Sequence, residues 1–211
     1  MKVMRNDCPV LEGRHVRLEP MRLAHLDGLV AAAAQDPRLY GWTIVPQGTA
    51  AIRRYMETAI AAREAGAAVP MVHVRVSDGC VVGSTRFFDL DRWAWPETHE
   101  RYADSTYDGC EIGWTWLAAD AVRTALNTES KLLMMAFAFE SWKVLRVQFS
   151  TDARNERSAA AIERLGAKLD GRLRAQKLAS DLTPRLSLRY SILSDEWPAV
   201  KAGLEQRLAA R

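Results

Sequence analysis

The strongest constraint on the fold is a strand-then-helix pattern that occurs twice in the second half of the chain. Residues 110–117 (CEIGWTWL) alternate as a strand does, and residues 127–142 form a mostly apolar helix that opens with the capping sequence NTES. A strand at 144–150 and a helix at 154–165, closed by Gly166, repeat this order. The alternation predicts a mixed sheet with helices on both faces.

The rest of the chain extends the predicted order to βααβββαβαββα, without an internal repeat or a low-complexity linker. The remaining elements are expected at 11–19 (strand), 21–35 and 49–66 (helices), 72–76 and 81–90 (a hairpin around the turn 77–79), 167–177 and 184–193 (strands) and 194–210 (helix). The fold class is therefore α/β (α+β), with a mixed central sheet of about seven strands. We expect a single domain over residues 1–211, with its core at 11–193 and a C-terminal helix.

Composition excludes several classes of protein. A chain of 211 residues with 48% hydrophobic and 26% charged residues fits one globular domain with a real core. The net charge of +3 and the scattered basic residues do not predict a nucleic-acid partner. No apolar run approaches a signal peptide or a membrane span. The cysteines form no CxxC pair and the histidines lack metal-ligand spacing, so we expect no disulfide, no metal and a reducing, cytoplasmic location.

A long loop at 91–109 is rich in tryptophan, tyrosine, proline and charge. A loop of this length inside a compact domain is usually functional or disordered. Its aromatic residues favour an ordered lid, and Trp93 and Trp95, with Trp42 from the loop at 40–48, are candidates for the wall of a substrate pocket. The alternative is that these tryptophans belong to the lid or the core alone.

The first strand-to-helix junction has the properties of an anion site. Unpaired N–H groups at the start of a helix, together with the positive end of the helix dipole, favour phosphate. Arg123, Thr124 and Asn127 add polar side chains around this loop. Taken alone, the same residues could serve only to cap the helix.

The second junction places Asn155 and Ser158 three residues apart at the start of the helix 154–165. Both side chains reach the groove of the first junction if the two strands are adjacent and parallel. The alternative is a capping box, in which Asn155 is the N-cap residue and Ser158 is only tolerated.

Together, the segments EIGWTWL, VRTALNTESK and DARNERSAAAIERLGAKLDGRLR resemble the GNAT N-acetyltransferase superfamily, particularly its RimJ/RimL branch of ribosomal-protein N-terminal acetyltransferases. The resemblance runs from LEGRHVRLEP to RYSILSDEW and covers nearly the whole chain. It implies acetyl-CoA as co-substrate, bound where two central parallel strands splay apart. It assigns the pantetheine arm, the pyrophosphate and the sulfur to Trp116, Leu117, Arg123, Thr124, Ala125, Leu126, Asn127, Thr128, Asn155 and Ser158.

The phosphate loop departs from the family pattern. The family has Gln/Arg-x-x-Gly-x-Gly/Ala, whereas residues 122–127 read VRTALN, so that Ala125 stands at the central glycine. Glycine permits a positive φ and a close approach of N–H groups to phosphate. Ala125 could lengthen those contacts, or be tolerated if its φ is negative. Asn127 replaces the last small residue and suits a left-handed or capping position.

Catalysis requires a base, because the attacking amine must lose a proton. The alternation in the strand 110–117 places Glu111 and Thr115 on the face opposite Ile112, Trp114 and Trp116. We expect Glu111 to be the base, acting through a water molecule. The alternative is a surface or salt-bridged carboxylate.

The resemblance further implies that Ser158 donates a proton to the leaving thiolate, and that the acceptor is a primary amine. The acceptor stays open between a protein N-terminus and a small amine. The altered loop keeps two alternatives: a longer acyl-CoA or carrier-protein thioester as donor, or a CoA-binding module without catalysis. A homodimer is expected from the family only.

Overall fold

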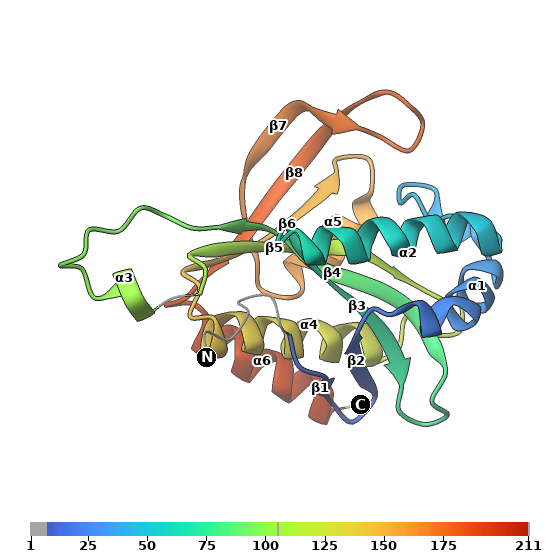
Figure 1. Cartoon of the computed structure of the whole chain (residues 1–211), viewed down its shortest axis with the longest axis horizontal. Helices are drawn as coiled ribbons and strands as arrows, with labels where there is room; N and C mark the ends of the chain where they lie inside the picture. The colour runs from blue at the N-terminus through green and yellow to red at the C-terminus, as the bar shows by residue number, and fades with distance from the viewer. Residues whose placement is uncertain (1–7, 105, 211) are drawn as a thin grey trace.

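The computed structural model describes residues 8–104 and 106–210, and a mixed sheet runs through the molecule (Figure 1). Its eight strands lie in the order β1-β2-β3-β4-β5-β6-β8-β7. Every neighbouring pair is antiparallel except β5 and β6, which are parallel. The strands are β1 (Leu11–Glu12), β2 (Val16–Pro20), β3 (Ala68–Arg75), β4 (Val81–Asp91), β5 (Gly109–Leu117), β6 (Arg146–Asp152), β7 (Lys168–Leu178) and β8 (Pro184–Leu193).

Helices cover both faces of this sheet. α1 and α2 pack on one face, against β4 and β3, while α4 and α6 pack together on the other face (Figure 1). α5 follows β6 and packs beside it. The helices are α1 (Leu26–Ala34), α2 (Thr49–Glu64), α3 (Arg101–Asp104), α4 (Leu126–Ala136), α5 (Glu156–Glu163) and α6 (Trp197–Ala209), with short 3-10 helices η1 (Leu23–His25) and η2 (Pro37–Tyr40). The predicted mixed α/β architecture is therefore confirmed.

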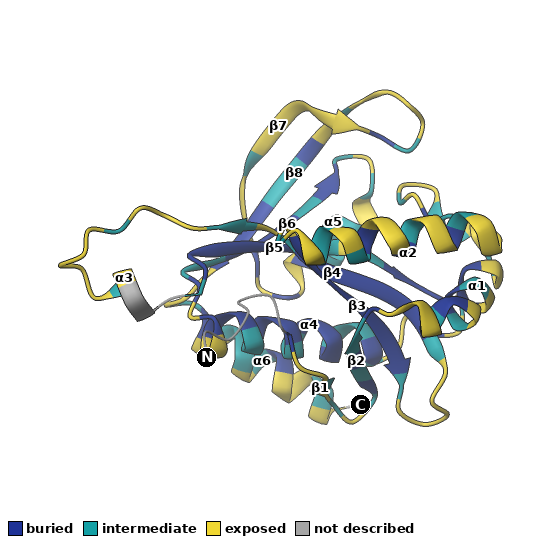
Figure 2. Cartoon of the chain, in the orientation of Figure 1, coloured by how far each residue is buried: buried dark blue, intermediate teal, exposed yellow. Residues whose placement is uncertain are grey.

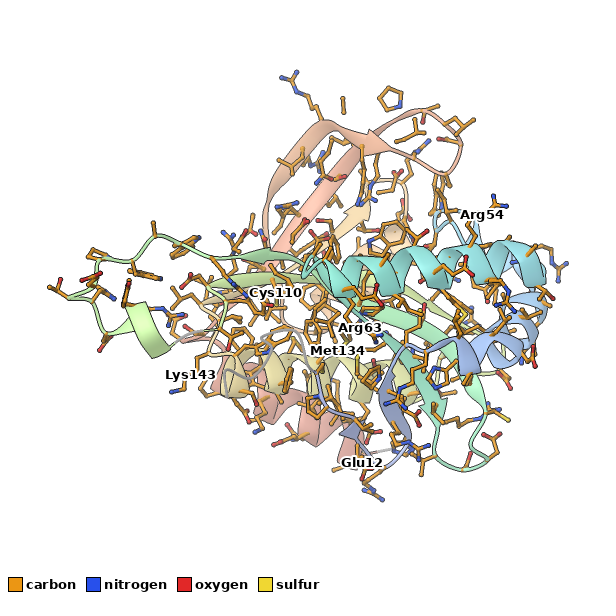
Figure 3. All side chains as sticks on the ribbon, viewed as in Figure 1. Glu12, Arg54, Arg63, Cys110, Met134 and Lys143 are labelled. Carbon is orange, nitrogen blue, oxygen red and sulfur yellow. The ribbon has the colours of Figure 1, made fainter. Side chains whose placement is uncertain are left out.

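The core lies between the sheet and the two helix layers, whereas β7 is exposed along most of its length (Figure 2). In α2, an apolar stripe that includes Ile52 and Met56 is buried, as the sequence spacing predicts. On the other side of the sheet, Met134 of α4 is fully buried against Thr85 of β4. Cys110, which Figure 3 labels near the start of β5, is also fully buried.

The strand predicted at 11–19 is two short strands, so the sheet has eight strands rather than about seven. Residues 13–15 form the turn between β1 and β2. The buried Glu129 carboxylate of α4 accepts hydrogen bonds from three consecutive amides, those of residues 14–16. A side chain at Gly13 would lie 2.5 Å from Glu129. The turn is therefore fixed by a residue more than a hundred positions away, which strand periodicity does not reveal.

A β-bulge in β5 overturns part of the predicted face pattern. The register with β4 shifts next to Arg86, and Trp114 has a positive φ of 53°. Trp114 is 49% exposed and its ring lies 4.4 Å from the Arg86 guanidinium. Thr115 turns instead toward α4. Trp114 therefore does not share a face with Ile112, nor Thr115 with Glu111.

The start of α4 also differs from the prediction. The helix begins at Leu126, with Ala125 in the N-cap position, so Asn127 lies inside the first turn and is not the cap. Thr124 Oγ1 accepts the amide of Leu126 at 3.2 Å. After Ala136 the helix continues as a π-helix (Phe137–Ser141). Within the described residues, no helix is both long and apolar enough to cross a membrane.

Candidate active site

The two parallel strands at the centre of the sheet part soon after they meet. β5 and β6 pair only over Gly109–Arg146, Cys110–Val147 and Glu111–Gln148. Beyond these pairs the facing edges diverge, while β5 stays paired with β4 and β6 with β8. The predicted splay is thus present, and Glu111 lies at its vertex.

Glu111 is a buried carboxylate that forms an ion pair with Arg189. Its side chain is 3% exposed, and Oε2 lies 3.5 Å from Arg189 Nη2. Burial raises the pKa of Glu111, and the charges of Arg189 and Lys177 only partly offset this effect. A carboxylate whose pKa is raised toward neutrality is better matched to accept a proton than an exposed one. The salt-bridged carboxylate, which was the alternative to the base, is thus present, and the role of Glu111 as a base stays a prediction.

The start of α4 offers unpaired backbone donors. Among the described residues, the amides of Ala125, Asn127 and Thr128 have no hydrogen-bond partner. The Asn127 Oδ1 atom is buried and also lacks a partner in the described chain. Together with the helix dipole, these groups fit a pyrophosphate.

The missing glycine of the phosphate loop is not needed for its backbone conformation. Ala125 has φ −65° and ψ −23°, an ordinary right-handed conformation. The left-handed residue of the loop is Arg123, with φ 63°. The condition for tolerating the Ala125 methyl group, a negative φ, is therefore met, and the effect on phosphate contacts stays a prediction.

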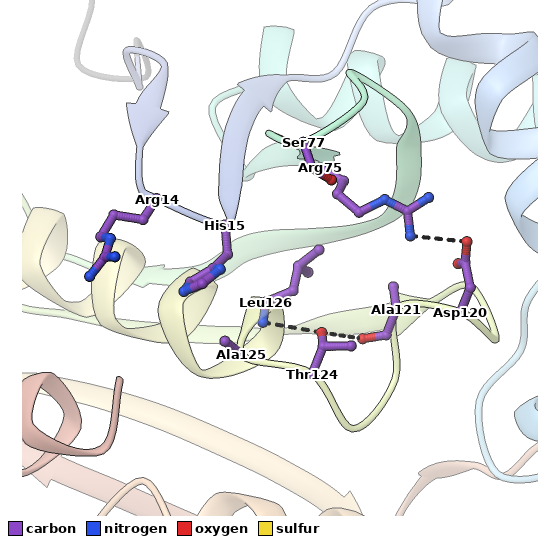
Figure 4. Close-up of a pocket in the computed structure, with 9 residues that line it drawn as sticks. All are labelled: Arg14, His15, Arg75, Ser77, Asp120, Ala121, Thr124, Ala125 and Leu126. Carbon is purple, nitrogen blue, oxygen red and sulfur yellow. Dashed lines mark hydrogen bonds and ion pairs between the residues drawn. The ribbon is translucent and has the colours of Figure 1, made fainter. Parts of the chain in front are cut away.

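A pocket beside this loop adds two residues that the sequence did not reveal. Arg14 and His15, from the β1–β2 turn, lie next to Ala125 and the first turn of α4 (Figure 4). Arg75 lines the same pocket, but Asp120 and Asp78 hold its guanidinium at 3.0 and 2.8 Å. The complete lining is Arg14, His15, Arg75, Ser77, Asp120, Ala121, Thr124, Ala125 and Leu126.

Trp116 and Leu117 lie between this loop and the 3-10 helix η2. The Tyr40 hydroxyl donates to the Leu117 carbonyl at 3.1 Å. The Tyr40 ring packs edge-on against buried Trp116, with centroids 5.9 Å apart. A side chain at Gly83 of β4 would lie 2.1 Å from the Trp116 carbonyl, so glycine permits the close approach of these strands. The two residues are thus fixed by β4 and η2, next to the expected pantetheine path.

Asn155 and Ser158 occur at the corresponding end of β6. Asn155 Oδ1 accepts the amide of Ser158 at 3.1 Å and caps α5, as in the capping alternative, but the return bond of a capping box from the Ser158 side chain is not formed. The Ser158 hydroxyl forms no hydrogen bond within the described chain and is half-buried. The predicted role of Ser158 toward a ligand stays a prediction.

The three tryptophans predicted to form one wall are separated. The Arg154 guanidinium lies over the Trp42 ring, with its Cζ atom 4.5 Å from the ring centre. Trp93 and Trp95 belong to a loop that projects away from α2 and from the β7–β8 hairpin (Figure 1). There the buried Asp108 carboxylate accepts the Trp93 amide and the Trp95 indole N–H, each at 2.7 Å. The loop is thus ordered by its own contacts, and only Trp42 lies near α5.

A buried lysine on the opposite face of β5 was missed. Lys131 of α4 is 5% exposed, and its Nζ donates to Thr115 Oγ1 at 2.6 Å and to Thr85 Oγ1 at 3.3 Å. Burial lowers the pKa of Lys131 to about 7. A lysine directly before the apolar run LLMMAFAF, on a helix predicted to be mostly apolar, was a signal that could have revealed it.

The comparisons with known proteins agree with this geometry. A family model described as Acetyltransferase (GNAT) domain matches residues 15–168, more than half of the chain. No curated protein matches. The solved structure of a protein from T. thermophilus, described as a candidate acetyltransferase, is 34% identical, with 96% of this chain and 98% of that chain covered and a TM-score of 0.77.

Two more distant structures show the same fold. A GCN5-related N-acetyltransferase from Brucella melitensis is 23% identical, with 96% and 86% covered and a TM-score of 0.82. Mycobacterium smegmatis RimJ, in complex with CoA-disulfide, is 18% identical, with 91% and 88% covered and a TM-score of 0.73. The fold and the splayed strands define an acyl-CoA-dependent transferase. The chain belongs to the GNAT acetyltransferases, in agreement with the resemblance seen in its sequence.

A negative charge in the loop tests whether the α4 start holds the pyrophosphate. Ala125→Asp is expected to weaken CoA binding at least about 10-fold, because the carboxylate would repel phosphate from the unpaired amides. The helix itself should not be destabilised, since aspartate is a favourable N-cap residue. Calorimetric titration with CoA and a melting curve measure the two effects.

Two controls make this result specific. Acetyl-pantetheine lacks the phosphates, so Ala125→Asp should leave its use unchanged. Ala125→Gly should change CoA affinity less than about 2-fold, because Ala125 already has a negative φ. Equal loss of CoA and acetyl-pantetheine binding would place the pyrophosphate elsewhere.

Proposed function

We propose that this protein transfers an acetyl group from acetyl-CoA to a primary amine by direct attack of the amine on the thioester. The observation that carries the proposal is the buried Glu111 carboxylate, with its raised pKa, at the vertex of the splayed strands. The unpaired amides at the α4 start support acetyl-CoA as donor, since they suit a pyrophosphate. The complex of the structural relative RimJ with CoA-disulfide supports the same donor for this chain.

Each residue has a defined part in the proposed reaction. Glu111, through a water molecule, takes the proton that the amine nitrogen loses as it forms the new bond to the acetyl carbon. The bond between that carbon and sulfur breaks, and the thiolate takes a proton from the Ser158 hydroxyl. Asn155, as the cap of α5, holds the helix start that carries Ser158. The products are the N-acetylated amine and CoA, and Glu111 and Ser158 regain their protonation states by exchange with solvent.

The acceptor and the acyl chain are tested together. Purified protein is incubated with acetyl-CoA or longer acyl-CoAs and a panel of amines and N-terminal peptides, and free thiol is measured over time. The proposal predicts amine-dependent thiol release that is fastest with acetyl-CoA, and mass spectrometry should show an acetylated product. Faster release with a longer acyl-CoA would favour the alternative donor, and CoA binding without any turnover would favour the non-catalytic module.

A further inference from the structure

One face of β6 and β8 carries an almost continuous set of polar side chains beside Glu111. Along β8, Arg185, Ser187 and Arg189 alternate onto this face, while the residues between them turn to the other face. Cross-strand pairing places Asp152 beside Ser187 and Ser150 beside Arg189. We call these five residues the β6–β8 polar face.

Basic side chains gather at both ends of this face. Arg189 contacts Glu111 at 3.5 Å. Lys177 of β7 is the cross-strand partner of Arg185, so its side chain lies on the same side of the hairpin. Partial burial and the charge of Arg185 lower the pKa of Lys177, and burial lowers the pKa of Arg185. The charges of Asp152 and Glu111 raise the pKa of Arg185, and that of Glu111 raises the pKa of Lys177, but neither cancels the effect of burial.

Several donors of the face have no acceptor. Among the described residues, Arg185 Nε and Nη2, Ser187 Oγ and Arg189 Nε are buried atoms without a hydrogen-bond partner. Asp152, the nearest acid in register, is already bound by Arg154 at 3.0 and 2.8 Å. Arg185 is half-buried, and two of its three guanidinium nitrogens are buried without an acceptor. Leaving buried N–H donors unpaired is unfavourable, so a ligand that brings an anion would be stabilised there.

The loop at 40–48 closes the end of the face near Arg185. Ser180, in the β7–β8 turn, donates to the Gly41 carbonyl at 2.8 Å. Arg154 stacks on Trp42 and also binds Asp181 of the same turn at 2.6 Å. A ligand on the polar face would therefore lie between Glu111 and this closed end.

The phosphates of acetyl-CoA do not account for these cations. Their donors are the amides at the start of α4, which follows β5. Arg185 lies on β8, and β6 separates β8 from β5 in the sheet. The unpaired donors of Arg185 are thus left for the second substrate.

We propose that the acceptor amine carries a carboxylate or similar anionic group, which Arg185 and Lys177 bind while the amine lies at Glu111. Arg185 and Arg189 are four residues apart, or about 13 Å along the strand. The amine and the anion should therefore be separated by several bonds. This inference rests on the proposed function, because it names the substrate class of the same site.

Matched pairs of acceptors test the charge requirement. The pairs are 4-aminobutanoate and its amide, 6-aminohexanoate and its amide, and the peptides Ala-Glu-amide and Ala-Gln-amide. We expect the anionic member of at least one pair to have a kcat/KM at least about 10-fold higher, since a charged hydrogen-bonded pair contributes that much to binding. The pair with the largest ratio reports whether the anion is a terminal carboxylate or an acidic side chain.

Arg185→Gln identifies the residue responsible. The variant should raise KM for the anionic acceptor about 10- to 100-fold, with kcat and the neutral acceptor changed less than about 3-fold. Arg185→Lys should restore part of the preference, because it keeps the charge. Arg172→Gln is the matched control: it removes one charge from the same hairpin, but Arg172 pairs with Leu188 on the opposite face.

Calorimetric titration of the CoA-saturated protein with the same pairs of acceptors measures acceptor binding in the absence of turnover. Binding of 6-aminohexanoate or Ala-Glu-amide that is lost in Arg185→Gln supports the inference even where acetylation is slow. Equal binding and equal turnover of the anionic and neutral members would overturn it, and so would a preference that survives in Arg185→Gln. Absence of thiol release with every amine contradicts the proposed function instead.

Discussion

Replacing Glu111 by glutamine is expected to lower kcat for amine acetylation by about 100- to 1,000-fold. A positioned general base contributes a factor of this size, and glutamine keeps the shape of the side chain but cannot take a proton. Binding of CoA should change little, because the donors proposed for its phosphates are the unpaired amides at the start of α4. Steady-state thiol release measures kcat, and calorimetry measures CoA affinity.

The pH dependence of the same pair of proteins gives an independent test. The base form of Glu111 is ionised, so the rate of the wild-type protein should fall as the pH falls through the pKa of Glu111. Burial raises that pKa, so the fall should begin at a higher pH than for an exposed glutamate. Glu111→Gln should lose this acidic limb.

A substitution on the surface controls for general effects. Glu57 lies on the exposed side of α2, and Glu57→Gln should leave kcat, its pH profile and the melting temperature unchanged. A Glu111→Gln protein that melts normally, yet keeps its wild-type kcat and its acidic limb, would remove Glu111 from the mechanism.

Structural features that depend on residues close together in the sequence could be predicted from the sequence. The capping of α5 by Asn155, which the sequence left open beside a role in cofactor binding, was recognisable because an N-cap needs only a side-chain acceptor three positions before the donor amide. The stripe of α2 is buried as its spacing indicates. The splay of β5 and β6 came from the family resemblance, since no local pattern encodes where two strands part.

Features that depend on distant residues could not be predicted. The turn between β1 and β2 is fixed by Glu129, and the face pattern of β5 is reversed by a bulge at Trp114. Periodicity assumes a regular strand, so one inserted residue moves every later side chain to the other face. The order of β8 and β7 in the sheet places Arg189 beside Glu111, although the two residues are far apart in the sequence.

The sequence already contains the pattern of one part of the candidate acceptor site. The segment PRLSLRYS alternates basic and polar residues with apolar ones, and that pattern predicts Arg185, Ser187 and Arg189 on one face of a strand. Only the structure shows that this face adjoins Glu111. Local patterns thus specify which side chains share a face, and the sheet order specifies what they meet.

Replacing the buried Lys131 by methionine is expected to stabilise the protein by about 3 kcal/mol at pH 8. Lys131 has a pKa of about 7 in the folded protein, against about 10.5 when exposed, so the unfolded chain binds its proton more tightly. Its burial therefore lowers the stability at every pH below about 10.5, with the full effect present below about pH 7. Methionine fills a similar volume without a charge, and the Thr85 and Thr115 hydroxyls still bond to each other at 2.9 Å.

The pH dependence of the stability difference between the wild-type protein and Lys131→Met distinguishes the effect of the lysine charge from an effect of better packing. The stability of the wild-type protein should rise with pH between about 7 and 10.5 relative to Lys131→Met, and the difference should vanish above that range. Denaturant unfolding at several pH values from about 7 to 10 measures it. Lys168→Met is a control whose effect should have the opposite sign. The exposed Lys168 pairs with Glu196, and this pairing raises the pKa of Lys168. Loss of Lys168 should therefore destabilise the protein slightly across this pH range. If the stability gain of Lys131→Met stays constant over the whole pH range, the lysine does not titrate in the core. In that case Lys131 stays charged, and it donates its hydrogen bonds to Thr115 and Thr85 as an ammonium group.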